Sequence, residues 1–188
     1  MPILGVTVAI FKDKRLLLTQ REDFDVWCLP GGGIEDGESP GLAARREALE
    51  EVGLEVELKR LVGIYSDPEL LHVGGHSIVV AGQPLGLEIH PDPSEVIEVR
   101  LFGADELPQV FQFGNRQRFL DALSGVGGSI IRVQNIAWPF DQPLTRQDIY
   151  ALRDRSNLSR AEFYHQYMGR ALVPPDLMEI NSNGVKNL

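Results

Sequence analysis

A glycine-rich turn that leads into a short acidic helix is the feature that most constrains how this chain can fold. Residues 31–38 (GGGIEDGE) are rich in turn formers, and Ser39 and Pro40 are favourable at the N-cap and first position of a helix. Gly53 stands where a left-handed residue commonly ends a helix. The sequence therefore predicts a loop followed by a helix over residues 39–52.

Three glutamates gather on this predicted helix. At 3.6 residues per turn, Glu47, Glu50 and Glu51 fall within a sector of roughly 100°. Repulsion between neighbouring like charges is unfavourable, so something else must favour the arrangement. The apolar side chains fall largely on the opposite side and are expected to form the packed face: Leu42, Ala44, Ala48, Leu49 and Val52. We therefore expect the carboxylates to share an exposed face and to bind Mg²⁺ or Mn²⁺, which prefer oxygen ligands.

The glycines before the helix, Gly31, Gly32 and Gly33, allow the backbone to approach a ligand closely. Their loop leads to the positive end of the helix dipole, where a phosphate oxygen is favourably bound. A phosphate-binding loop beside a cation-binding carboxylate face indicates phosphoanhydride chemistry. In this interpretation the cation withdraws charge from the phosphorus oxygens, and one carboxylate deprotonates an attacking water.

Residues 32–54, GGIEDGESPGLAARREALEEVGL, resemble the Nudix box, in which a Gly, five residues, a Glu and seven residues precede Arg-Glu-U-x-Glu-Glu-x-Gly-U, with U apolar. All nine specified positions are filled, by Gly32, Glu38, Arg46, Glu47, Ala48, Glu50, Glu51, Gly53 and Leu54. The resemblance extends over about residues 3–123, because residues 27–33 (WCLPGGG) and 95–108 (EVIEVRLFGADELP) also look like this family.

This resemblance implies an α/β fold of the Nudix type, an α/β/α sandwich with a mixed sheet between helices. It also implies an enzyme, a hydrolase that uses Mg²⁺ or Mn²⁺ to cleave the phosphoanhydride bond of a nucleoside diphosphate linked to another group. The sequence leaves ADP-ribose, nucleoside triphosphates, dinucleoside polyphosphates and nucleotide sugars open as substrates. The alternative is a non-catalytic Nudix domain that senses nucleotides and regulates a partner, but the intact set of glutamates favours the enzyme.

By this resemblance, the glutamates of the box are the catalytic and metal-binding residues. Glu47 and Glu51 are the firmest metal ligands, and Glu50 is either a ligand or the base that activates water. The carbonyl group of Gly31 is a further candidate ligand. Arg46 is expected to orient the glutamates through ion pairs, which suits the fork geometry of a guanidinium group.

Other positions have structural or variable roles in the family pattern. Glu38 and Gly53 are expected to be structural parts of the box. A further carboxylate outside the box is assigned to Glu95 or Glu98. Their spacing of three places them on opposite faces of a regular strand, so at most one of them is expected to face the metals.

The substrate is expected to contact the glycine loop and the segment before it. Gly32 and Gly33 would approach its phosphates, and Arg21, Phe24 and Trp27 could stack on a base or clamp it. Packing in the protein core is an equal alternative for Trp27.

The rest of the chain is predicted from its apolar pattern and its turn residues. Strands are expected over residues 3–11, 15–20, 54–65, 76–81, 85–89 and 96–102, the first two as a hairpin, and a second helix over residues 115–123. The glycines within residues 125–128 mark a boundary between a Nudix domain, residues 1–125, and a helical C-terminal extension with a loose tail, residues 126–188.

The extension contains two short capped segments, residues 144–155 and 158–170, neither of which should be a stable helix alone. Residues 1–125 carry 11 basic and 21 acidic side chains, whereas residues 126–188 carry 7 and 6. We therefore expect the extension to dock on an acidic body, and we predict a homodimer in which it forms part of the interface or walls the substrate pocket. The alternative is that it completes the core of the monomer.

The composition limits the remaining possibilities. A net charge of −9 argues against binding to DNA, RNA or acidic membranes, so the expected partner is a small nucleotide substrate. No uncharged apolar run approaches the length of about 18 residues that a membrane span needs, and the N-terminal apolar stretch predicts a strand instead of a signal peptide. Cys28 is the single cysteine, which excludes an intramolecular disulfide. We expect a cytoplasmic protein.

Overall fold

The first strand, β1 (Ile3–Lys12), belongs to two sheets and holds them together. Most of β1 runs parallel to β6 (Gly75–Pro84), and its last residues pair with β2 (Arg15–Arg21) as an antiparallel hairpin. The turn of this hairpin lies at Asp13 and Lys14, which both have positive φ. The computed structural model describes residues 2–68, 70, 73–86, 88–125, 130–134, 139–168 and 177–180.

The larger sheet is mixed. On one side of β1 lies the short antiparallel strand β4 (Gly31–Gly33), and on the other side β6 pairs in antiparallel fashion with β5 (Val56–Asp67). β8 (Ile130–Val133) is parallel to β5, and β9 (Leu177–Ile180) is antiparallel to β8. The smaller sheet is antiparallel and joins β2 to β3 (Trp27–Cys28) and to β7 (Val96–Phe102).

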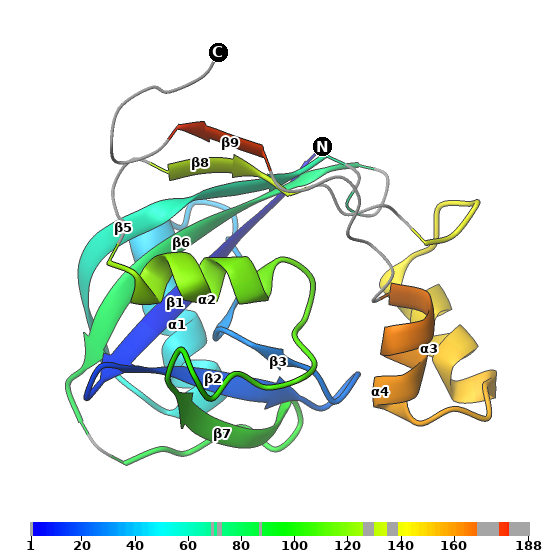
Figure 1. Ribbon diagram of the computed structural model, residues 1–188, viewed down its shortest axis with the longest axis horizontal. Coiled ribbons are helices and arrows are strands. Elements are labelled where there is room, and N and C mark those ends of the chain that lie inside the picture. The colour runs from blue at the N-terminus through cyan, green and yellow to red at the C-terminus, as the bar shows by residue number, and fades with distance from the viewer. Residues whose placement is uncertain are drawn as a thin grey trace.

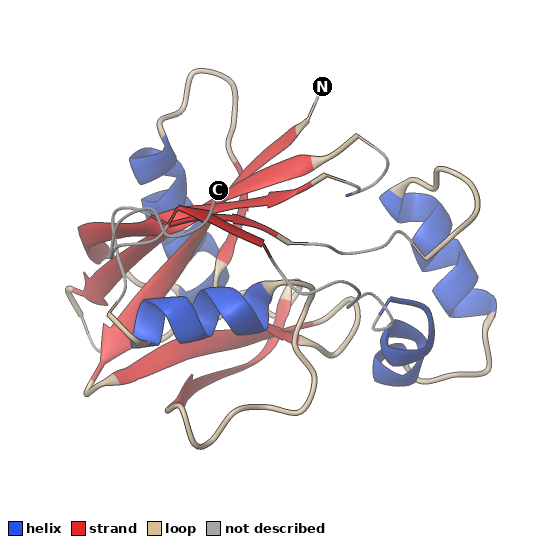
Figure 2. Ribbon diagram, turned by 45° about the horizontal axis from the view of Figure 1, so that its top comes forward, coloured by secondary structure: helices blue, strands red, loops and turns tan. Residues whose placement is uncertain are grey.

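Two helices cover opposite faces of this arrangement, as Figure 1 and Figure 2 show. α1 (Pro40–Val52) packs its alanines against one face, where it meets Val6 and Val8 of β1. α2 (Asn115–Leu123) packs Phe119 and Ala122 against the other face. Successive residues of a strand point to opposite sides, so β1 contributes to both cores.

The C-terminal segment forms a third apolar cluster with the turn between β2 and β3. α3 (Arg146–Arg155) is followed by α4 (Arg160–Phe163), which continues as a π-helical turn over Tyr164–Met168. The members of the cluster are Phe24, Val26, Ile149, Phe163, Tyr164 and Met168. Most apolar side chains of the two capped segments are therefore covered by their own chain, although Leu152 and Tyr167 are exposed.

Several predicted elements are confirmed. The hairpin, the helix after Pro40, the helix over residues 115–123 and the strand over residues 96–102 are present. Ser39 caps α1 by accepting a hydrogen bond from the amide of Leu42 (3.2 Å), and Gly53 ends the helix in the left-handed conformation. The capping boxes predicted at Thr145 and Ser159 are also formed.

Other predictions are wrong or fall outside the described residues. The strand expected over residues 85–89 is absent at positions 85, 86, 88 and 89, because β6 ends at Pro84 and no neighbouring strand offers a partner there. The C-terminal extension is not only helical, since β8 and β9 enlarge the main sheet and residues 177–180 are a strand where a tail was expected. Residues 126–129, 169–176 and 181–188, with most of the predicted boundary and tail, lie outside the description.

No helix among the described residues has both the length and the apolar character that crossing a membrane requires.

The pairing of β8 with β5 can be tested at Gly63, because a side chain there would collide with the neighbouring strand. A Cβ atom at this position would lie 2.8 Å from the carbonyl oxygen of Ile130. We predict that Gly63→Ala lowers the free energy of unfolding by about 1–3 kcal/mol, measured by urea denaturation. Gly86→Ala is the control, because its Cβ would meet nothing within 4 Å. Equal losses in the two variants would contradict this pairing.

Candidate active site

The glutamates of α1 divide between a buried and an exposed surface, which corrects the expectation of one exposed carboxylate face. Glu47 and Glu51 are only 8% and 5% exposed, whereas Leu42 and Leu49, expected to be packed, are 57% and 53% exposed. Glu50 lies at the surface. The reason is that β4 and its loop cover one flank of α1 while the sheet covers another. The buried sector of the helix is therefore rotated toward the two glutamates.

Arg46 joins four groups of the loop and helix through its guanidinium. It donates two hydrogen bonds to Glu38, of 3.0 and 2.9 Å, which is the bidentate geometry of an arginine–carboxylate pair. It also donates to Glu47 (2.7 Å), to Glu50 (3.0 Å) and to the carbonyl oxygen of Gly33 (2.9 Å). These contacts are the ones that an orienting residue would make.

The glycine loop lies in direct contact with the buried carboxylates of Glu47 and Glu51. The amide of Gly31 donates a hydrogen bond of 3.3 Å to Oε2 of Glu51. A Cβ atom on Gly32 would lie 2.5 Å from Oε1 of Glu47, closer than any real contact. A Cβ atom on Gly31 would lie 2.2 Å from the carbonyl oxygen of Val6 on β1. Glycine at position 31 therefore lets β4 lie directly against β1, and glycine at position 32 leaves room for the carboxylate of Glu47 in its present place.

Burial makes the charged form of these carboxylates unfavourable. It raises the pKa of Glu51 to about 8, although the positive charge of Arg21 opposes the shift. It also raises the pKa of Glu47, against the hydrogen bond and charge of Arg46. The negative charges of Glu47 and Glu95 add to the shift at Glu51. A cation placed among these carboxylates would offset both desolvation and repulsion.

The donor set fits a hard divalent cation. No complete group of three His, Cys, Asp or Glu ligands is preassembled in the part of the chain that the structure describes. Mg²⁺, however, is commonly held by one or two carboxylates while waters and substrate phosphates complete its shell. Glu47 and Glu51 would supply those two carboxylates. The contact of Gly31 with Glu51 uses its amide, so its carbonyl group stays a predicted ligand.

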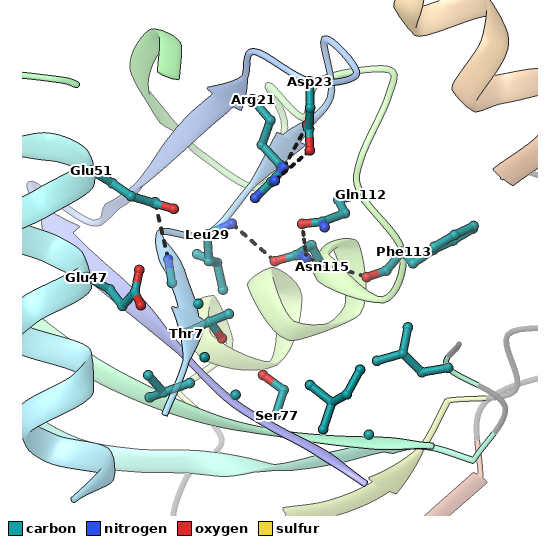
Figure 3. A pocket seen from close by; sticks show the side chains of 18 of the residues that line it. Thr7, Arg21, Asp23, Leu29, Glu47, Glu51, Ser77, Gln112, Phe113 and Asn115 are labelled. Atoms are coloured by element: carbon teal, nitrogen blue, oxygen red, sulfur yellow. Dashed lines mark hydrogen bonds and ion pairs between the residues drawn. The ribbon is translucent and has the colours of Figure 1, made fainter. Parts of the chain in front are cut away.

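These residues line a cavity of about 750 Å³. Figure 3 shows Glu51 and Arg21 projecting toward the same space, with Asp23 behind Arg21. Of the two carboxylates considered outside the box, Glu95 lines the cavity and Glu98 does not. Glu98 lies instead on the exposed face of β7.

The two aromatic candidates do not line the cavity. Phe24 is buried in the cluster formed with the C-terminal helices. Trp27 packs edge-on against Phe102, with ring centroids 4.9 Å apart. Trp27 therefore packs in the protein core, which was the alternative to substrate binding. The other substrate-binding candidates, Arg21, Gly32 and Gly33, do line the cavity.

Several cavity residues were not recognised in the sequence. They come from α2 and from the C-terminal segment: Asn115, Arg118, Arg146, Tyr150 and Arg153. Asn115 is buried and accepts a hydrogen bond of 3.1 Å from the amide of Leu29, which fixes α2 against the strand before the glycine loop. The helical spacing of Arg146, Tyr150 and Arg153 was visible and places them on one face, but only the tertiary structure brings that face to the cavity.

Comparisons with known proteins agree with this geometry. The family model of the NUDIX domain matches residues 1–122. The chain is 34% identical over 129 residues to a MutT-like protein from Streptomyces ambofaciens, covering 67% of this chain and 81% of that protein. It is 43% identical over 61 residues to diphosphoinositol polyphosphate phosphohydrolase 2 of Rattus norvegicus, covering 32% of this chain and 34% of that protein. The crystal structure of an ADP-ribose pyrophosphatase from Streptococcus suis superposes with a TM-score of 0.58 at 29% identity, over 66% of this chain and 92% of that one.

The close contact at Gly32 predicts a sharp difference between two neighbouring glycines. Gly32→Ala should displace the carboxylate of Glu47 and lower kcat by roughly 100-fold, because a displacement of about 1 Å is costly in an active site. At Gly33 a Cβ would meet nothing within 4 Å and would leave Glu47 in place, so Gly33→Ala should lower kcat much less and should act mainly on KM, through the substrate. Steady-state kinetics on both variants, with circular dichroism as the folding control, checks this. Similar losses in both would show that crowding of Glu47 is not the cause.

The raised pKa of Glu51 predicts how the metal-free protein responds to pH. Burial raises the pKa of Glu51 to about 8 in the folded protein, whereas the unfolded chain releases this proton near the ordinary pKa of 4.5. Unfolding therefore releases a proton in this interval, and the free energy of unfolding should fall as pH rises through it. Melting temperatures of the metal-free protein between these pH values should fall more steeply than those of Glu51→Gln. Added Mg²⁺ should reverse the loss in the wild type only. Parallel curves for the two proteins would contradict the assignment.

Proposed function

The chain belongs to the Nudix family of hydrolases, and we propose that it is a pyrophosphohydrolase that requires Mg²⁺ or Mn²⁺ and cleaves a nucleoside diphosphate linked to another group. The observation that carries the proposal is the buried pair Glu47 and Glu51, held against the glycine loop at the wall of a cavity large enough for a nucleotide.

The proposed reaction is attack of water on one phosphorus of the anhydride. The new P–O bond forms to the water oxygen, the bond to the bridging oxygen breaks, and the bridging oxygen leaves with its phosphate. A bound divalent cation would act as a Lewis acid on the phosphoryl oxygens. Glu47 and Glu51 would hold that cation, and Arg46 would keep the carboxylates in place. Glu95, which lines the cavity, and Glu50, whose charge acts on Glu47, are the carboxylates left to accept the proton of the water.

The relatives do not identify the substrate of this chain, because two of them are named for different compounds, ADP-ribose and diphosphoinositol polyphosphate. Arg21 is the residue of the cavity that supports a phosphate-bearing ligand most directly. It is half-buried and held by Asp23, and its charge acts on Glu51. A panel of nucleotide derivatives, with phosphate detected after phosphatase treatment, would identify the substrate.

A non-catalytic nucleotide sensor is the alternative, and it would use the same cavity. The organisation of the glutamates around Arg46 favours the enzyme, because binding alone does not require buried carboxylates that repel a phosphate. Turnover of any compound in the panel decides between the two.

Localisation and assembly are also proposals. We propose a cytoplasmic protein, because its net charge of −9 and its single cysteine fit a reducing compartment without acidic polymers as partners. The homodimer stays a proposal that rests on the prevalence of symmetric dimers and on the charge difference between the two parts of the chain, because most apolar side chains of the extension pack on their own chain. Light scattering of the intact protein measures the mass that tests it.

The central role of Glu51 predicts a large effect of a minimal change. Glu51→Gln removes the charge but keeps the shape, and should lower kcat about 1,000-fold or more because the cation is held less well. Removal of divalent cations by chelation should abolish turnover, and Mg²⁺ or Mn²⁺ should restore it. Glu98→Gln is the matched control, since Glu98 lies outside the cavity. Wild-type turnover in Glu51→Gln would exclude the proposed role.

A further inference from the structure

The cavity has a second wall that the Nudix box does not supply. α3 contributes Arg146, Tyr150 and Arg153, which lie at positions i, i+4 and i+7 and so share one face of the helix. Glu47 and Glu51 of α1 line the same cavity. α1 thus brings two carboxylates and α3 brings two arginines to one cavity, which Arg21 and further carboxylates such as Asp23 also line. The arginines of α3 suit a ligand with more than one anionic group.

This second wall is built around Asp23, in the turn between β2 and β3. Asp23 accepts two hydrogen bonds from Arg21, of 2.9 and 2.7 Å, and one of 3.0 Å from the hydroxyl of Tyr150. Burial opposes the charge on Asp23, but these partners outweigh it and hold its pKa below the ordinary value. The carbonyl oxygen of Asp23 accepts a further hydrogen bond of 2.6 Å from Arg153. α3 is therefore fixed to the same aspartate that fixes Arg21.

The arginines of this wall are not equivalent. Arg153 is engaged in the fold, because it also donates 2.8 Å to Asp154 and lies over the rings of Phe24 and Tyr150, at 5.5 and 4.8 Å from their centroids. Arg146 lies one turn before Tyr150 and is exposed. Within the described part of the chain it donates no hydrogen bond and joins no ion pair, although it contributes positive charge at Asp23.

We propose that Arg146 binds a phosphate group on the part of the substrate that lies beyond the cleaved anhydride. A guanidinium fork matches the oxygens of a phosphate, and its donors are open here on a helix that Asp23 holds in place. Glu47 and Glu51 repel a phosphate that no cation neutralises, so an additional phosphate is more favourably placed beside Arg146. The ligand class is a nucleotide with a phosphate ester in addition to its diphosphate. Its identity as substrate rests on the proposed function.

The binding part of the proposal is tested without catalysis. Inorganic pyrophosphate is titrated into the metal-free protein, and the Nε–Hε signals of the arginines are followed by NMR. We expect saturable binding that shifts the Arg146 signal and is weakened roughly tenfold in Arg146→Gln, because a charge-assisted hydrogen-bonded contact is lost. Arg155→Gln is the matched control, an exposed arginine of the same helix that does not line the cavity. The absence of saturable binding, or equal weakening in both variants, would overturn the proposal.

The substrate part is tested by kinetics on two nucleotides that differ by one phosphate ester, NADPH and NADH, with Mg²⁺ present. Arg146→Gln should raise KM for NADPH roughly tenfold with little change in kcat, and should leave the KM for NADH nearly unchanged. Equal changes for both compounds would show that Arg146 does not recognise the additional phosphate. If neither these compounds nor the nucleotide panel is hydrolysed by the wild type, the proposed function fails, while the NMR titration still decides on the anion site.

Discussion

Two like-charged carboxylates buried next to each other are the constraint on which the rest of this structure depends. Glu47 and Glu51 lose solvation without gaining a full set of partners, and their raised pKa values express that cost. The fold creates the situation through close approach, because Gly31 lets β4 lie directly against β1 and Gly32 leaves room for the carboxylate of Glu47. Arg46 offsets part of the cost at Glu47, and a divalent cation would offset the remainder. The stability of this region is thereby linked to the function proposed for it.

The surrounding elements keep this arrangement in register. β1 pairs with β4 near its start and with the hairpin strand β2, which carries Arg21, at its end, and residues of both strands reach the same cavity. Asn115 ties α2 to the strand that precedes the loop. The C-terminal segment then closes the cavity through contacts with Asp23. The C-terminal extension is thus part of the cavity wall, which is one of the two roles that its sequence predicted.

The sequence predicts the local parts of this site well, because their signals are local. The caps of α1, the hairpin and the nine positions of the box are all encoded within a few residues of one another. The packed face of α1 was predicted only in part: Ala44, Ala48 and Val52 are buried as expected, but Leu42 and Leu49 face solvent. Two glutamates share the buried sector instead, which the periodicity of the apolar side chains does not show. The parallel pairing of β8 with β5 and the approach of α3 to the cavity depend on contacts distant in sequence, for which a short pattern carries no signal.

The central claim is that the buried carboxylate pair is a cation site. The most direct measurement is an anomalous difference map from crystals grown with Mn²⁺, recorded at a wavelength where manganese scatters anomalously. The account predicts a peak at coordinating distance from the carboxylate oxygens of both Glu47 and Glu51, and its loss in crystals of Glu51→Gln. Manganese bound only elsewhere, or an empty pair at saturating Mn²⁺, would contradict it.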